Sequence, residues 1–203
     1  MSDPLDEVLH QSRELGFLGP GPIAEQRAHA EAFLSAIDPA GVGAVVDLGT
    51  GGGLPGLVLA QLLPDTTWVL LDSMVRRTAF LEEAVTRLGL ADRVQVLTAR
   101  AEDVGRTERR GQQDLVVARS FGAPAVTAEC AAPLLRIGGQ LVVSEPPRTA
   151  AARWPSGQLA VFGLALEATI EGPPHFVRLR QERLAPRAYP RRSGTPRKQP
   201  LWT

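Results

Sequence analysis

The sequence is poor in the residues that form disulfides and metal centres. It has one cysteine, Cys130, and three histidines spread along 203 residues. A single thiol cannot form an intramolecular disulfide, and scattered histidines without partner thiols do not make a zinc site. We therefore expect neither a disulfide framework nor a bound metal ion.

Long uncharged apolar runs are missing as well. No segment reaches the roughly eighteen apolar residues that a membrane-spanning helix needs. The first ten residues, MSDPLDEVLH, are acidic where a secretory signal would be basic and then apolar. The sequence thus predicts a cytoplasmic protein that does not enter a membrane, and its length favours one domain with short appendages.

Lysine is nearly absent, and positive charge is concentrated at one end of the chain. Only one of the 22 basic residues is a lysine. Residues 1–177 contain 14 arginines and 21 acidic residues, whereas residues 178–203 contain eight basic residues and one acid, Glu182. Such a basic segment either neutralises the phosphates of a nucleic acid or folds back on an acidic body. Charge alone favours neither interpretation.

From residue 44 onward, short apolar runs alternate with helical patterns. Continuous Val/Leu runs are typical of strands buried on both faces, as in a parallel sheet covered by helices. Strands are expected at 44–48, 68–72, 93–97, 114–118 and 139–144, with helices near 54–63, 75–88 and 124–135. This alternation predicts an α/β fold with a doubly wound, mainly parallel sheet.

The segments on either side of this alternation have different patterns. Two helices, at 5–15 and 23–37, are expected within a helical extension that covers residues 1–43. Two runs around Glu171-Gly172-Pro173-Pro174 predict an antiparallel hairpin, which ends a core domain spanning 44–185. Residues 186–203, rich in proline and arginine, are expected to form an irregular basic tail.

The first predicted strand runs into a glycine-rich turn, VVDLGTGGGLPG. Gly49, Gly51 and Gly53 have no β-carbon, so a ligand can approach the backbone closely. Asp47 would repel a pyrophosphate and favours a ligand with a positive amino group and a sulfonium. Leu54 stands where a dinucleotide motif counted from Gly49 needs its third glycine. A site for NAD and a purely structural turn are the alternatives.

Further polar residues follow the later strands at the same edge of the sheet. Asp72, with Ser73 beside it, ends the second strand, where a carboxylate accepts both hydroxyls of a ribose. It can also cap the following helix. Ala101-Glu102 follow the third strand and Arg119 follows the fourth. Because the carboxyl ends of parallel strands meet at one edge, these residues predict one ligand crevice.

These motifs resemble those of the bacterial small-subunit ribosomal RNA guanine-N7 methyltransferase family, also called glucose-inhibited division protein B. The resemblance spans about residues 44–143 and rests on the run from Asp47 to Gly56, on Leu70-Leu71-Asp72-Ser73, and on the pairs that end in Glu102 and Arg119. It implies a Rossmann-like class I methyltransferase that uses S-adenosyl-L-methionine. The residues it assigns to the cofactor are Asp47, Gly49, Gly51, Gly53, Leu54, Asp72, Ser73, Ala101, Glu102 and Arg119.

The resemblance also implies an acceptor, the N7 atom of a guanine in 16S ribosomal RNA. The RNA or the small ribosomal subunit would be bound through the basic tail. Guanine N7 has a free lone pair and no proton to lose, so methyl transfer needs orientation and no general base. We therefore assign no catalytic residue. Arg119 is a candidate for positioning, and Phe121 is a candidate for stacking on the unstacked base.

Some residues depart from the family pattern. Glu145-Pro146-Pro147 stand where the family usually has Lys-Gly, which predicts a negative charge that repels RNA phosphates at the crevice mouth. The family's His-x-x-Asp-Ser run is absent after His29. Two alternatives follow: a methyltransferase for a small molecule, and a cofactor-binding relative without catalytic activity.

Overall fold

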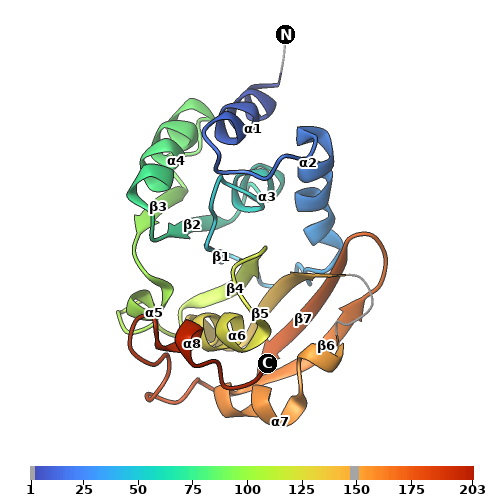
Figure 1. The fold of residues 1–203 in the computed structure, drawn as a ribbon, viewed down its shortest axis with the longest axis vertical. Helices are drawn as coiled ribbons and strands as arrows, with labels where there is room; N and C mark the ends of the chain where they lie inside the picture. The colour runs from blue at the N-terminus through green and yellow to red at the C-terminus, as the bar shows by residue number, and fades with distance from the viewer. Residues whose placement is uncertain (1–2, 147–150) are drawn as a thin grey trace.

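The computed structural model describes residues 3–146 and 151–203, which fold around one seven-stranded sheet (Figure 1). The strand order is β3-β2-β1-β4-β5-β7-β6, with β1 to β5 parallel and β7 antiparallel to both of its neighbours. The strands are β1 Ala44–Leu48, β2 Thr67–Asp72, β3 Val94–Thr98, β4 Gln113–Ala118, β5 Leu135–Glu145, β6 Leu164–Ile170 and β7 His175–Gln181. The doubly wound sheet with a terminal antiparallel hairpin is confirmed.

Helices cover both faces of this sheet. One face carries α1 Pro4–Glu14, α2 Ile23–Glu31, α3 Gly56–Leu62 and α4 Val75–Arg87. The other carries α5 Ala101–Val104, α6 Pro124–Ala131, α7 Ser156–Leu159 and α8 Thr195–Lys198. The structure also contains the short 3₁₀ helices η1 Ala32–Ser35, η2 Ala151–Arg153 and η3 Ala160–Phe162. Within the described residues, no helix is long and apolar enough to cross a membrane.

The strands are buried on both faces, as their unbroken apolar runs predict. Successive residues of β1 enter opposite cores: Val45 packs with α1 to α4, while Val46 packs with α6 and the terminal hairpin. Both side chains are fully buried. Burying such a side chain contributes about 1.5–3 kcal/mol, so the two faces together hold the carboxyl ends of the strands in fixed positions.

The N-terminal helices share the core of the sheet. Leu5, Leu9 and Phe33 belong to the same cluster as α3 and α4, and Phe33 meets Phe176 of β7 with ring centroids 4.6 Å apart. This packing places α2 beside the ends of β4 and β5.

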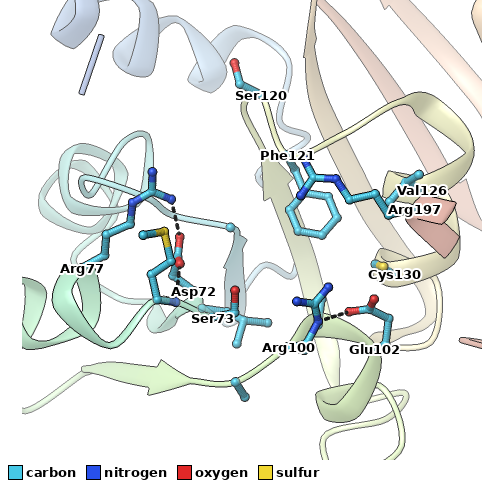
Figure 2. A pocket seen from close by; sticks show the side chains of 15 residues that line it. Asp72, Ser73, Arg77, Arg100, Glu102, Ser120, Phe121, Val126, Cys130 and Arg197 are labelled. Atoms are coloured by element: carbon cyan, nitrogen blue, oxygen red, sulfur yellow. Dashed lines mark hydrogen bonds and ion pairs between the residues drawn. The ribbon is translucent and has the colours of Figure 1, made fainter. Parts of the chain in front are cut away.

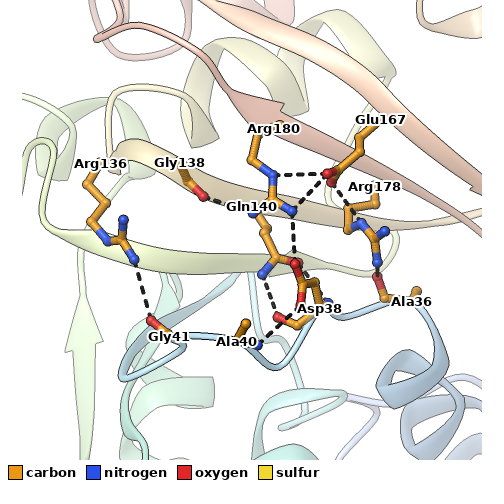
Figure 3. Close-up of polar contacts among 10 residues, drawn as sticks. All are labelled: Ala36, Asp38, Ala40, Gly41, Arg136, Gly138, Gln140, Glu167, Arg178 and Arg180. Carbon is orange, nitrogen blue, oxygen red and sulfur yellow. Dashed lines mark hydrogen bonds and ion pairs between the residues drawn. The ribbon is translucent and has the colours of Figure 1, made fainter.

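A polar cluster ties the end of the extension to the hairpin (Figure 3). Arg180 of β7 binds Asp38 at 3.2 Å and Glu167 of β6 at 2.9 Å. The side chain of Gln140 in β5 both donates to and accepts from the Asp38 backbone, at 2.7 and 2.9 Å. Residues from four segments therefore fix the chain between α2 and β1.

Two elements differ from their predicted bounds. The helix expected over 23–37 is α-helical only to Glu31 and continues as η1. Strand β5 begins at Leu135, four residues early, because an irregularity in its pairing with β4 lets the strand continue through Gly138, whose φ is +81°. Glycine adopts this left-handed conformation without steric cost.

The basic tail folds back on acidic residues, one of the two arrangements consistent with its charge. Arg191 forms an ion pair with Glu129 of α6, Nη2 to Oε2 2.6 Å, and Glu129 is 1% exposed. The Gly194 amide donates to Glu102 at 2.8 Å, and the Ser193 hydroxyl donates to Asp103 at 2.6 Å. The segment is irregular apart from the single turn α8.

Candidate functional site

Three adjoining cavities lie at the carboxyl edge of the parallel strands. The inner cavity, about 270 Å³, lies between the ends of β2 and β4 (Figure 2). The middle cavity, about 310 Å³, lies along the glycine-rich loop, and the outer cavity, about 340 Å³, lies beside α2. Gly49 lines the inner and middle cavities, while Arg119 lines the middle and outer ones. The three therefore adjoin one another along one crevice.

The glycine-rich loop is held from beneath by the end of β2. The Gly49 and Thr50 amides donate to the Leu71 carbonyl at 2.8 and 3.0 Å, and the Gly51 amide donates to Asp72 Oδ2 at 3.0 Å. A β-carbon on Gly49 would lie 2.5 Å from the Phe121 ring, whereas one on Gly51 would meet nothing closer than 3.8 Å. The loop is thus packed on one side and open at Gly51, where a ligand can approach.

Asp72 is the central polar group of the inner cavity. Its carboxylate is 6% exposed and accepts from the Gly51 and Met74 amides, with the Arg77 guanidinium 3.4 Å from Oδ2. It therefore caps the turn into α4, as one of its two expected roles requires. A carboxylate has about four lone-pair sites, so capacity remains for ligand hydroxyls.

Asp47 lies under the loop and lines none of the three cavities. It is 1% exposed, and its Oδ2 accepts from the Gly56 amide at 2.8 Å. Burial raises the pKa of Asp47 to about 6, partly offset by Thr50, the Gly56 amide and the positive charge of Arg119. A negative charge is therefore held close beneath the loop at neutral pH.

We expect Asp47→Asn to stabilise the ligand-free protein at pH 8 and to leave its stability at pH 4 nearly unchanged. An acid whose folded pKa is raised loses stability as pH rises from its unfolded value, 3.8, to about 6. At about 1.4 kcal/mol per pKa unit, the charge costs up to about 3 kcal/mol above pH 6. Urea unfolding at both pH values measures this difference, and equal stabilities at pH 8 would contradict it.

The inner cavity is closed by residues from α5 and the tail. Glu102 is 5% exposed and is held by Gly194 of the tail and, at 3.8 Å, by Arg100. The Arg197 side chain lies beside Phe121, on the wall opposite Asp72 (Figure 2). The cavity is thus bounded by acidic groups at two points and by arginines from three segments.

Arg119 lies where the middle and outer cavities meet. Its hydrogen bonds within the described ranges, 3–146 and 151–203, are to the Gln26 carbonyl and side chain, at 3.4 and 3.3 Å. Burial lowers the pKa of this guanidinium, and the charge of Asp47 opposes the effect. Arg119 is therefore a cation held mainly by neutral partners, with donors available to a ligand.

Most of the predicted site residues meet around this crevice. The inner cavity is lined by Asp72, Ser73, Ala101 and Glu102, and the middle one by Gly51 and Leu54. Gly49 lines both the inner and the middle cavity, and Arg119 lines both the middle and the outer one. Gly53 lines none of them; a β-carbon there would lie 2.5 Å from Leu57, so this glycine serves packing.

Sequence reasoning missed several lining residues. They are Gln26, Arg77, Cys130, Ser144 and Arg197. The sequence marked Arg197 only as part of the basic tail, and no pattern placed the other four beside the cavities.

The expectation that Glu145 places a free negative charge at the crevice mouth is wrong. Its side chain is 2% exposed, is paired with Arg153 at 2.5 Å, and lines none of the cavities. Ser144, the preceding residue of the strand, lines the outer cavity instead. Pro146 is exposed, and Pro147 lies outside the described residues.

Phe121 does not reach the outer cavity. Ser120 has a positive φ of 57°, and the Phe121 ring that follows packs over Gly49 and lines the inner cavity. The aromatic ring therefore belongs to the same cavity as Asp72, and it is not placed to stack on a base beside α2.

Comparison with known proteins identifies the family. Residues 30–146 match the family model described as rRNA small subunit methyltransferase G. Ribosomal RNA small subunit methyltransferase G of Synechococcus sp. (strain WH7803) is 39% identical over 77% of this chain, and that of Syntrophomonas wolfei is 37% identical over 77% of it. The chain covers 65% of the length of the first relative and 76% of the second.

Solved structures share the fold at lower identity. Cofactor-bound Rv0187 from MTB is 22% identical, with a TM-score of 0.63 over 90% of this chain and 91% of that one. The mitomycin 7-O-methyltransferase MmcR is 21% identical, with a TM-score of 0.61 over 86% of this chain and 60% of that one. The family model covers more than half of the chain, and the two solved structures share its fold. This chain therefore belongs to the rRNA small subunit methyltransferase G family.

Proposed function

We propose that the protein is an S-adenosylmethionine-dependent methyltransferase that modifies N7 of a guanine in 16S ribosomal RNA. The observation that carries this proposal is the placement of Asp72: a buried carboxylate beside the open backbone of Gly51, in a chain of this family. Residues 44–185 would hold the cofactor, and residues 1–43 would cover the acceptor side of the crevice.

The residues of the crevice fit S-adenosylmethionine. Asp72 would accept the ribose hydroxyls, and the Ala101-Glu102 pair would bound the adenine in the inner cavity. The buried negative charge of Asp47 beneath the loop suits a cationic group above it, while Arg119 suits a carboxylate. When bound, the cofactor supplies a methyl group on a sulfonium, the electrophile of the reaction.

The contribution of the chain to the reaction is orientation and exclusion of water. Guanine N7 needs no proton removed, so the proposed reaction requires no dedicated base. Arg119 connects the middle cavity to the outer one, where an acceptor would enter. A fixed alignment of donor and acceptor can supply about 7–11 kcal/mol of the barrier.

We assign ribosomal RNA binding to the outward side of the tail. Arg187, Arg192 and Lys198 are exposed, whereas Arg191 is used internally against Glu129. Exposed basic residues bind phosphates without regard to sequence, and each contact adds about one unit to the salt dependence. Because the Glu145 charge is buried and paired, the main argument for a small-molecule acceptor is removed.

Calorimetric titration with S-adenosylmethionine, followed by methyl transfer to small subunits that lack the modification, tests this function. We expect binding, and transfer of one methyl group to a guanine. Arg192→Gln with Lys198→Gln should weaken subunit binding and lower its salt slope by about two, with cofactor affinity unchanged. Absence of cofactor binding would overturn the proposal, and binding without transfer would favour a catalytically silent relative.

A further inference from the structure

The outer cavity has a polar lining whose parts come from three segments. Glu25 and His29 come from α2. Across the cavity from them lie Arg119, which follows β4, and Ser144, near the end of β5. The outer cavity adjoins the middle cavity, with which it shares Gln26, Arg119 and Ser120. A group bound here would therefore lie next to the glycine-rich loop on the side away from Asp72.

One side of this cavity is rigid. His29 Nε2 lies 2.7 Å from the Ser144 hydroxyl, and its ring meets Phe176 edge-on with centroids 6.0 Å apart. Burial and the charge of Arg119 lower the pKa of His29, so the imidazole is neutral at pH 7. A planar ligand would thus find a fixed, uncharged polar wall.

The two charged groups of the cavity have opposite hydrogen-bonding character. Arg119, at the junction with the middle cavity, can only donate. Glu25 is exposed and lines the outer cavity but not the middle one. Its ionised carboxylate can only accept hydrogen bonds. No interaction of the Glu25 side chain with another residue is found among the described residues.

We propose that the outer cavity receives the acceptor guanine and that Glu25 reads its pyrimidine edge. The proposal rests on the proposed function. With N7 directed toward the middle cavity, the neighbouring O6 accepts from Arg119, and the N1–H and N2–H₂ donors on the other side of the ring reach Glu25. The base enters unstacked, as enzymes that modify bases require.

This arrangement selects guanine over adenine. Adenine carries an amino group where guanine carries O6, so two donors would meet at Arg119. Its N1 is an acceptor, so it would face the lone pairs of Glu25. Both contacts therefore become repulsive with the wrong purine, which strengthens discrimination.

The test is Glu25→Gln, measured by methyl transfer to unmodified small subunits. We expect kcat/KM to fall about 10- to 100-fold, the usual cost of a lost two-point base contact. The affinity for S-adenosylhomocysteine should stay unchanged. Glu14→Gln, an exposed residue of α1, is the matched control and should leave kcat/KM within about twofold.

The sign of the change separates recognition from general electrostatics. If Glu25 only repels phosphates, removing its charge raises RNA affinity and leaves kcat/KM unchanged or higher. An activity equal to or above that of the unchanged protein therefore overturns the inference about Glu25. Absence of transfer by the unchanged protein overturns both this inference and the proposed function.

A second measurement uses small subunits reconstituted with inosine at the methylated position. Inosine lacks only the N2 amino group, so the unchanged protein should lose activity on it. Glu25→Gln should show a clearly smaller loss, because the two changes remove parts of the same contact. An equal loss in both proteins would show that Glu25 does not contact this edge.

Discussion

Asp72→Ala is expected to reduce the affinity for S-adenosylmethionine by at least 100-fold. A hydrogen bond to a charged group is worth about 1.5–3 kcal/mol, and two ribose hydroxyls would lose such a partner. The same change leaves the Gly51 and Met74 amides without the carboxylate to which they donate hydrogen bonds of 3.0 and 2.9 Å. Ligand contact and loop geometry are thus lost together, and calorimetric titration measures the sum.

Two further variants show whether the loss is local. Asp65→Asn changes an exposed acid between α3 and β2 and should bind the cofactor normally. Asp72→Asn keeps the shape of the side chain, but its NH₂ group must face a backbone donor, so we expect a weaker site here too. Full cofactor affinity in folded Asp72→Ala would remove Asp72 from the site.

Arg191→Ala should lower the free energy of unfolding by about 3–5 kcal/mol. The Arg191 backbone and side chain bind Glu129 at 2.6 to 3.1 Å, and Glu129 is 1% exposed. Removing one partner leaves a buried carboxylate without its counter-charge. For a chain of this length, about 2–4 °C per kcal/mol predicts a melting temperature roughly 10 °C lower.

The neighbouring residue and a double variant complete this test. Arg192→Ala removes an exposed arginine and should change stability by less than about 0.5 kcal/mol. Adding Glu129→Gln to Arg191→Ala should restore part of the loss, because the uncompensated charge is removed. A melting temperature unaffected by Arg191→Ala would show that the tail is not held by this pair.

The sheet could be predicted from local pattern because each strand carries its own signal. The runs that became β1 and β2 are apolar over nearly their whole length, and the acid that ends β2, Asp72, marks the ligand edge. The predicted ends of an element were wrong where tertiary contacts determine them. At Gly138, for example, an irregular pairing with β4 extends β5.

The site was predicted only where it follows a strand end. Asp72 and Arg119 could be placed because parallel strands bring their carboxyl ends together. The role of Glu145 could not be predicted in this way. Its charge is paired with that of Arg153, and no sequence pattern between the two residues indicates that they meet. Nor does any periodicity in α2 show that its polar residues turn toward β5.

The tail also makes the inner cavity depend on the last residues of the chain. All seven strands end before Arg191, whereas Arg197 forms part of the cavity wall and the Gly194 amide holds Glu102. A truncation just after β7 would therefore keep every strand of the sheet and remove one wall of the cavity.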